Sequence, residues 1–300
     1  MNPSCPACQS TRTAYFHKMM NQFTYYRCSS CKMVFLHPVP SAKSISSLYD
    51  THYEFTVSDR GKRRFEAQAA HIFTTIRSIS PDAKTLLDVG SGPGTFVEMA
   101  QSAGFTALGI EPAKNLYQES LRLPITTINA EFEAYFKKNP RKKFDVISLI
   151  HVVEHLRNPE KALRLIANHL HKNGILFIET PNIDSHLFDV EQTQYTFLTP
   201  PAHINLFSAN SVKAIAQRLG ISIGTVATYS YPEHFMAVIR RIKRAEVGKK
   251  SAAVGNSTKH SASTQTHTLP FIDAHIAPAL TPILNIGTKG SILQTYLKKN

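Results

Sequence analysis

Cysteine is scarce in this chain and confined to one end. All four cysteines lie within the first 31 of the 300 residues, and none follows. Any active site formed by the remaining residues therefore lacks a thiolate nucleophile. This absence excludes catalysis through a covalent cysteine intermediate in the body of the chain.

Long apolar stretches are lacking as well. The longest candidate, Val146–Val153, contains Ser148 and His151 and falls far short of the roughly 18 apolar residues that span a membrane. The first ten residues, MNPSCPACQS, show no basic start followed by an apolar stretch, so no signal peptide is expected. We therefore expect a soluble, cytoplasmic chain that forms one large domain with appendages, or two smaller domains.

Acidic residues are outnumbered by basic ones, 21 to 34, which gives a net charge of +13. Such a balance allows anionic partners such as nucleic acid, phosphorylated substrates or acidic membrane surfaces, but it does not select among them. The basic residues cluster at 60–64, 137–143, 240–250 and the last few positions. Because charge runs are usually exposed, we expect these clusters to be solvated surface.

The four cysteines form two Cys-x-x-Cys pairs, Cys5 with Cys8 and Cys28 with Cys31. This spacing is typical of a structural zinc site with four thiolate ligands, and the stretch between the pairs is expected to form a hairpin. A disulfide is disfavoured in a reducing cytosol. The spacing therefore predicts a zinc ribbon, while a site without metal stays open as the alternative.

From Thr85 onward a pattern of strand, turn and helix repeats. Strands are expected at 85–90, 106–112, 125–130, 144–150, 174–182, 221–228 and 234–240. Helices are expected at 61–79, 96–104, 114–121, 158–174 and 209–219. Strands that alternate with helices of this length predict an α/β fold with a doubly wound, Rossmann-like parallel sheet covered on both faces.

The composition also predicts domain boundaries. We expect a zinc ribbon at 1–38, a connector and helix at 39–80, and the α/β domain at 81–245. Residues 246–270 are rich in Ser, Thr and Ala and are expected to form a flexible linker. The final segment, 271–300, is apolar again and is expected to form a strand or a docking helix.

A glycine-rich turn follows the first strand of the sheet as Asp88-Val-Gly90-Ser-Gly92-Pro-Gly94, and Glu111 closes the next strand. Such a turn lets backbone amides approach a ligand closely, and an acid at that distance suits the two hydroxyls of a ribose. Nicotinamide enzymes share this geometry, but the third glycine of their G-x-G-x-x-G fingerprint is replaced here by Thr95. Asp88 would also oppose a pyrophosphate and suits a cationic or zwitterionic ligand.

Four segments, LLDVGSGPGTF, GIEP, FDVISLIHVVEHLRNP and GILFIETPN, occur in this order. Together they resemble the class I S-adenosylmethionine-dependent methyltransferases, and the resemblance covers roughly residues 85–240. It implies a seven-stranded sheet whose last strand is antiparallel, with S-adenosylmethionine as cofactor. The cofactor-binding residues that it implies are Asp88, Gly90, Ser91, Gly92, Gly94, Glu111, Pro112, Asn129, Ala130, Glu131, Ile150, His151 and Val152.

Residues 151–155 read HVVEH, which is also the spelling of a zinc-protease signature. That chemistry needs both histidines on a regular helix, whereas here the first histidine follows directly from a predicted buried strand. We therefore expect no zinc-protease site. His151 and Glu154 are expected to contact cofactor or substrate. For His155 the same role and that of a packed, hydrogen-bonded structural residue stay open as equal alternatives.

The methyl acceptor needs a base if it is an oxygen or a carbon, and His203 follows the variable connection that should cover it. A zinc ribbon ahead of this domain resembles bacterial enzymes that methylate nucleotide-linked sugars or other small metabolites. The Tyr-His-Glu-His-like stretch of the sugar C-methyltransferases is reduced here to the last histidine, which favours O-methylation. Predicted catalytic residues are His203, Tyr195 and His151, with Asn205 as a further helper. The alternative for His203 is a core histidine satisfied by backbone.

Two other function classes stay open. The first is methylation of rRNA or tRNA, which the zinc ribbon and the positive charge would suit. However, the Asn/Asp-Pro-Pro-aromatic stretch of exocyclic-amine methylation is missing, and so is the cysteine for the covalent route to carbon 5 of pyrimidines. The second is a non-catalytic zinc-ribbon interaction protein, which the intact Asp88, Gly90, Gly92 and Glu111 disfavour.

Overall fold

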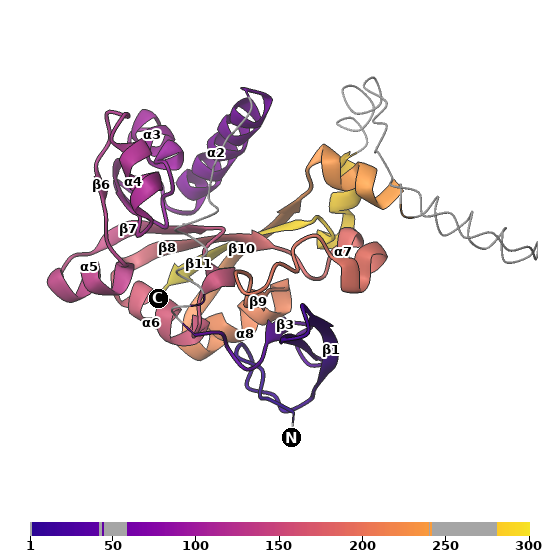
Figure 1. Cartoon of the computed structure of the whole chain (residues 1–300). Helices are drawn as coiled ribbons and strands as arrows, with labels where there is room; N and C mark the ends of the chain where they lie inside the picture. The colour runs from indigo at the N-terminus through magenta and orange to yellow at the C-terminus, as the bar shows by residue number, and fades with distance from the viewer. Residues whose placement is uncertain (1, 42–43, 45–58, 240, 242–280) are drawn as a thin grey trace, which may run out of the picture.

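A seven-stranded sheet forms the centre of the molecule (Figure 1). The computed structural model describes residues 2–41, 44, 59–239, 241 and 281–300. The strand order is β10-β11-β8-β7-β4-β5-β6. The strands are β4 (Thr85–Val89), β5 (Thr106–Ile110), β6 (Thr127–Ile128), β7 (Phe144–Ile150), β8 (Leu170–Pro181), β10 (Ile221–Tyr229) and β11 (Ile292–Lys299). Strand β11 runs antiparallel to both of its neighbours, and the pairs among β4 to β8 are parallel.

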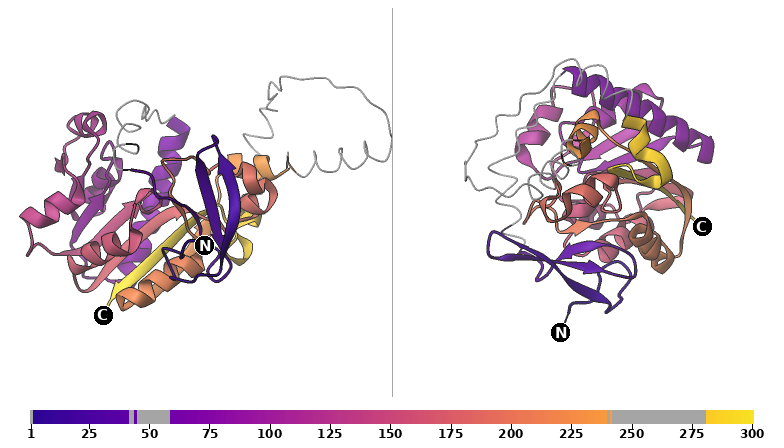
Figure 2. Two further views of the ribbon diagram at one scale, coloured as in Figure 1. Left: turned by 60° about the horizontal axis from the view of Figure 1, so that its bottom comes forward. Right: turned by 90° about the vertical axis from the view of Figure 1, so that its right-hand side faces the viewer.

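Helices cover both faces of this sheet, as Figures 1 and 2 show. One face is covered by α2 (Asp59–Ile79), α3 (Thr95–Ser102) and α4 (Lys114–Ser120). The other is covered by α5 (Phe132–Lys138), α6 (Pro159–Asn168) and α8 (Ala209–Leu219). Apolar residues at helical spacing on α2, among them Ile72 and Ile76, are buried against the sheet. The predicted doubly wound α/β fold is confirmed.

The seventh strand is not where the sequence placed it. Residues 232–239 form a helix rather than the expected strand, and β11, from the C-terminal segment, occupies the position between β10 and β8. Pro232 stands at the first position of that helix, where its fixed φ angle is favourable. All six residues from Ile292 to Leu297 are buried, because both faces of this strand are covered.

A second correction concerns the helix expected at 158–174. Asn158 caps α6 and Pro159 is its first residue, as expected, but the helix ends at Asn168 and β8 starts two residues later. Gly174 lies inside β8 instead of closing a helix. A Cβ atom there would lie 3.0 Å from the carbonyl oxygen of His171 and 3.1 Å from that of Asp145, so a close backbone approach explains this glycine.

A second sheet of four strands, β1-β2-β3-β9, lies at one end of the molecule beside α8 (Figure 1). Its first three strands are β1 (Thr13–Met19), β2 (Phe23–Cys28) and β3 (Val34–Leu36), and the hairpin expected between the cysteine pairs is confirmed. The fourth strand, β9 (Asn205–Leu206), comes from a segment much later in the chain and pairs with β3. The segment between β8 and β9 contains α7 (His186–Glu191), and the linker expected at 246–270 lies outside the described residues.

Among the described helices, none is long and apolar enough to cross a membrane.

Candidate active site

The glycine turn lies between the carboxyl end of β4 and the start of α3, at the edge where ligands bind in open α/β sheets. Gly90, Gly92 and Gly94 have φ angles of 72°, 55° and 87°, a region that favours glycine. A Cβ atom on Gly90 would lie 2.5 Å from Val152, and one on Gly94 would lie 2.2 Å from Ile125. A Cβ atom on Gly92 would meet nothing within 4 Å. Gly92 therefore borders open space, whereas the other two are needed for packing.

Glu111 holds this turn in place. Its carboxylate accepts hydrogen bonds from the backbone N–H of Gly92 at 2.8 Å and of Ala113 at 2.7 Å. Burial raises the pKa of Glu111, although both hydrogen bonds oppose that shift. Asn129 donates to the carbonyl oxygens of Glu111 and Pro112, so the ends of β5 and β6 are tied together. The structure thus brings these predicted cofactor residues to one edge of the sheet.

Asp88 is almost completely buried at the end of β4. Burial raises its pKa to about 7, although a hydrogen bond from the Ser148 hydroxyl at 2.7 Å opposes this shift. Ser91 lies next in the turn, and its hydroxyl is buried without a hydrogen-bond partner among the described residues. Asp88 is therefore close to its titration point at neutral pH, where a cationic group nearby would favour the ionised form.

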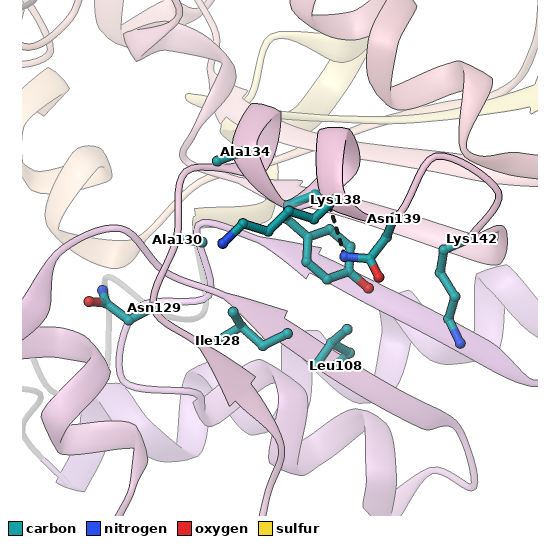
Figure 3. Close-up of a pocket in the computed structure, with 9 residues that line it drawn as sticks. Leu108, Ile128, Asn129, Ala130, Ala134, Lys138, Asn139 and Lys142 are labelled. Atoms are coloured by element: carbon teal, nitrogen blue, oxygen red, sulfur yellow. Dashed lines mark hydrogen bonds between the residues drawn. The ribbon is translucent and has the colours of Figure 1, made fainter.

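A hollow of about 450 Å³ opens beside β5, β6 and α5 (Figure 3). Two predicted cofactor residues, Asn129 and Ala130, line it together with the apolar side chains of Leu108 and Ile128. The side chains of Lys138 and Lys142 also border it. The glycine turn and Glu111 are not among its lining residues, so the hollow adjoins only the β6 end of the predicted cofactor site. Ala130 is followed at this end by Glu131, whose pKa is raised by burial.

His151 follows β7 directly and stands between two buried carboxylates. Its Nδ1 lies 3.2 Å from Glu154 Oε1 and its Nε2 lies 3.6 Å from Glu179 Oε1. The side chains of Glu154 and Glu179 are 0% and 1% exposed, whereas 38% of the His151 side chain is exposed. Burial alone would lower the pKa of His151, but the hydrogen bond to Glu154 and the two negative charges raise it. Two carboxylates face one imidazole ring, so the cluster has a net negative charge whether or not His151 is protonated.

His151 also has a φ angle of 53°, which is unusual for a residue other than glycine. The positive φ lies at the strand end, between Ile150 of β7 and Val152, which packs against Gly90. A backbone conformation of this kind costs free energy and persists only where surrounding contacts fix it. The backbone N–H of His151 donates to the carbonyl oxygen of Glu179 at 2.9 Å, which is one such contact.

His203 and His155 face each other next to this cluster. Their ring centroids are 4.9 Å apart. Nδ1 of His203 lies 2.8 Å from the carbonyl oxygen of Phe197, and Nδ1 of His155 lies 2.9 Å from that of Ala202. Burial lowers the pKa of His203 to about 4, so the ring is neutral at pH 7. A neutral ring that donates from Nδ1 keeps the lone pair of Nε2 as an acceptor.

The HVVEH segment forms no regular helix. Val153–His155 is one turn of 3-10 helix after β7, and its two histidines point to different partners: His151 to Glu154 and Glu179, His155 to His203. The stacked pair of a zinc protease is therefore not formed at these residues. A different group, Glu154 with His155 and His203, has ligand atoms within 4.8 Å of one another, which is metal-ligand spacing.

Glu179 is a site residue that the sequence reasoning missed. Its carboxylate accepts from Gln68 of α2 at 2.6 Å, from Gln294 of β11 at 2.8 Å and from the Tyr229 hydroxyl at 3.0 Å. The available signal was a charged residue directly after the apolar run GILFI, close to the carboxyl end of the strand. Its partners come from three segments that are distant in the sequence, and no local sequence pattern predicts them.

Tyr195 lies in an aromatic part of the core, and the ring of Phe197 stands between it and His203. Its side chain is buried against Phe188 and Phe197, and its hydroxyl donates to the carbonyl oxygen of Asn182 at 2.9 Å. Asn205 is buried too and donates to the carbonyl oxygen of Leu156 at 2.6 Å. Both polar groups are thus committed to backbone, which is the arrangement of packing residues.

The four cysteines meet in one cluster. The Sγ atoms of Cys5 and Cys31 lie 3.5 Å apart, those of Cys8 and Cys28 lie 3.6 Å apart, and all four lie within 4.8 Å of one another. Tetrahedral zinc with Zn–S bonds of about 2.3 Å places its sulfurs roughly 3.8 Å apart. The cysteines are unpaired by disulfides. The donor set and its spacing fit a zinc ion.

Comparison with known proteins agrees with this geometry. Residues 61–225 match a family model described as a methyltransferase domain. A ubiquinone biosynthesis O-methyltransferase of Glaesserella parasuis serovar 5 (strain SH0165) is 32% identical over 108 residues, which is 33% of this chain and 46% of that protein. A dTDP-3-amino-3,4,6-trideoxy-alpha-D-glucopyranose N,N-dimethyltransferase of Streptomyces venezuelae is 32% identical over 132 residues, 42% of this chain and 54% of that protein. The chain thus spans about half the length of such curated relatives.

A solved structure shows the same fold. A SAM-dependent methyltransferase from Archaeoglobus fulgidus superposes with a TM-score of 0.52 at 16% identity, over 86% of this chain and 100% of that one. The family model spans more than half of the chain and includes the glycine turn, Glu111 and the HVVEH segment. The chain belongs to the methyltransferase domain family and has the class I fold of the S-adenosylmethionine-dependent methyltransferases.

Proposed function

We propose that the protein transfers a methyl group from S-adenosylmethionine to a hydroxyl group of a small molecule, with sugar nucleotides as the first acceptor class to test. The observation that carries this proposal is the pair of neighbouring features at one sheet edge: an open glycine turn tied to Glu111, and a neutral His203 with a lone pair at Nε2. The first suits the cofactor and the second suits a hydroxyl acceptor.

The cofactor side is supported by charge and space. S-adenosylmethionine carries a sulfonium and an ammonium group, and Asp88 together with the net negative cluster around His151 suits a cationic ligand. Glu111 would accept from the ribose hydroxyls, and Gly92 would leave room for the methionine part. Asn129, Ala130 and Glu131 would border the adenine, beside the apolar wall of Ile128.

On the acceptor side, His203 would act as the base. When bound, the cofactor supplies an electrophilic methyl group. The acceptor oxygen would take this methyl group with S-adenosylhomocysteine as the leaving group, and His203 Nε2 would take the hydroxyl proton. Phe197 fixes the tautomer through Nδ1, and the charge of Glu154 favours the imidazolium that results. The enzyme then contributes mainly positioning and proton transfer.

A second route to the same reaction is favoured by one observation. The grouping of Glu154, His155 and His203 also suits a divalent cation, which would bind the acceptor oxygen and lower its pKa in place of a base. The four cysteines would separately hold a structural zinc. Turnover that falls on removal of a weakly bound ion, and returns with added Mn²⁺ while the zinc content is constant, would select this route.

The test starts with calorimetric titration of S-adenosylmethionine and S-adenosylhomocysteine into the wild-type protein and a Glu111→Gln variant. Binding that the variant weakens by roughly 1–3 kcal/mol, the cost of a lost charged hydrogen bond in a buried site, would support the cofactor site. If the wild-type protein binds neither compound, the enzymatic proposal fails and a zinc-ribbon interaction protein becomes the leading reading.

Turnover of sugar nucleotides then tests the base. His203→Asn should lower kcat by roughly 10²–10⁴-fold without changing cofactor affinity. His171→Asn is the matched control, because His171 is exposed at the opposite end of β8. A kcat of His203→Asn equal to that of the wild-type protein would refute the role of His203 as the base. Salt-sensitive binding and methylation of RNA, without turnover of small molecules, would favour the nucleic-acid class instead.

A further inference from the structure

The cysteine ribbon and the segment that carries His203 belong to one sheet. Strand β3 pairs with β9 in antiparallel register, Val34 opposite Leu206 and Phe35 opposite Asn205. The backbone N–H of Leu36 extends this pairing to the carbonyl oxygen of Ile204 at 2.8 Å. Residues that follow His203 directly in the sequence are therefore held by the ribbon.

Further hydrogen bonds join the ribbon to the same segment. The hydroxyl of Tyr25 donates to the backbone carbonyl oxygen of His203 itself at 2.8 Å, and Ser208 donates to the carbonyl oxygen of Cys31 at 2.6 Å. Lys32 forms an ion pair with Asp184 at 2.8 Å. In the described part of the chain, the hydrogen bonds found between residues 2–36 and residues beyond the neighbouring His37 end on Asp184 and on residues 203–208.

The segment also shares its apolar core with the ribbon. Tyr25, Val34 and Leu36 pack in one buried cluster with residues of the connection between β8 and β9 and of the helix at 232–239. Those partners are Ile183, Leu187, Phe188, Tyr195, Leu198, Ile204, Leu206, Phe235 and Val238. In Figures 1 and 2 the ribbon lies on the side of the molecule where β9 and α8 lie, while α4 and β6 lie on the far side. The connection thus lacks a complete core without the ribbon.

We propose that the zinc ribbon is a structural part of the acceptor site: it positions His203 through β9 and Tyr25, so that zinc binding sets the geometry of the acceptor side more strongly than that of the cofactor side. The cysteines themselves pack in the main core cluster, together with residues of the seven-stranded sheet such as Ile147 and Leu149. Tyr25 is then a positioning residue, because it contacts His203 through the backbone and does not face the reacting atoms. The inference rests on the proposed function for the role of His203. Its structural half states that residues 199–208 are ordered only when the ribbon is folded. This half does not depend on the catalytic role of His203.

Two measurements on the full-length protein test the structural half. Metal analysis should find about one zinc per chain, as a four-cysteine site requires. Hydrogen exchange with and without a zinc chelator should then show faster exchange at residues 199–208, by at least about tenfold, because these amides lose the support of the ribbon. The amides of Gly90 and Ser91, which donate to the carbonyl oxygen of Ile110, should exchange at an unchanged rate.

A pair of tyrosine variants tests the positioning half. Tyr25→Phe removes only the hydroxyl that bonds His203, and Tyr15→Phe is the matched control on β1, where the side chain is 61% exposed. Tyr25→Phe should lower kcat by roughly 3- to 10-fold, the effect of one lost hydrogen bond on a positioned group, with unchanged affinity for S-adenosylmethionine. Tyr15→Phe should match the wild type in both quantities.

Several outcomes would overturn the inference. If the hydrogen-exchange rates at residues 199–208 do not depend on zinc, the ribbon is an independent module. If removal of zinc raises the exchange rates uniformly, including those of Gly90 and Ser91, the ribbon is a general stabiliser of the fold. Equal kcat for both tyrosine variants would remove the role of Tyr25. Absence of cofactor binding in the wild type would instead refute the proposed function, and the exchange result would still decide the structural half.

Discussion

Alanine substitutions at Gly92 and Gly94 should separate a glycine that borders ligand space from a glycine required by packing. Both residues have positive φ angles, 55° and 87°, so each substitution costs roughly 1–2 kcal/mol of stability from backbone strain. At Gly94 the new methyl group would also lie 2.2 Å from Ile125 Cδ1 and 3.3 Å from Ser120 Cβ. Overpacking of this kind adds about 1–3 kcal/mol.

The expected totals are therefore about 1–2 kcal/mol for Gly92→Ala and about 2–5 kcal/mol for Gly94→Ala, measured as the free energy of unfolding in urea. Gly92→Ala should remain folded and lose affinity for S-adenosylmethionine by at least about tenfold, or 1.4 kcal/mol, because its methyl group enters the open space beside the turn. Calorimetric titration at a temperature well below the melting transition gives that affinity. Wild-type affinity in Gly92→Ala would refute the placement of the cofactor, and equal stability of the two variants would refute the packing argument.

Three further predictions follow from single side chains. Because the pKa of Asp88 is raised to about 7 by burial, affinity for the cationic cofactor should rise with pH between about 6 and 8, and Asp88→Asn should abolish this slope in calorimetric titrations. The same raised pKa gives Asp88 a contribution to the free energy of unfolding that is fully present below about pH 4 and is lost as pH rises through about 7. Asp88→Asn should therefore flatten the dependence of that free energy on pH in this window. A variant with the wild-type dependence would contradict the raised pKa. Tyr195→Phe should lower stability by roughly 1 kcal/mol in urea unfolding through the lost bond to Asn182 and keep kcat within twofold, whereas a large loss of kcat would return Tyr195 to the catalytic residues.

The sequence predicted most of the sheet because its strands are short apolar runs that alternate with helices of clear periodicity. It misplaced the last strand because the apolar residues of 234–239 fit a strand or a helix equally well in so short a stretch. The deciding signal was Pro232 at the helix start. The true strand, β11, is separated from β10 by more than sixty residues of sequence, and its pairing with β8 is a tertiary contact that no local pattern encodes.

The site was predictable to a similar extent. The glycine turn, Glu111 and His203 were singled out because each follows a strand or a variable connection in a recognisable pattern, and their roles in binding and catalysis stay predictions. Glu179 and Gln68 were missed, because their hydrogen bond joins β8 to α2 across 111 residues of sequence. Tyr195 was chosen from its sequence position, although its hydroxyl donates to a backbone carbonyl oxygen in the core. Patterns along the chain identify groups at strand ends, but they do not show which way a side chain in a connection points.

The position of β11 has a consequence for the order of events during synthesis. This strand fills the gap between β8 and β10, and its Gln294 donates to the buried carboxylate of Glu179. When the nascent chain has emerged from the ribosome through β10 but not yet through β11, β8 has an unpaired edge. Glu179 then lacks one of its hydrogen-bond donors. The glycine turn, by contrast, is built from residues made much earlier. A nascent chain should therefore acquire its cofactor half first, and the charged surroundings of His151 only once residues 292–299 have left the exit tunnel.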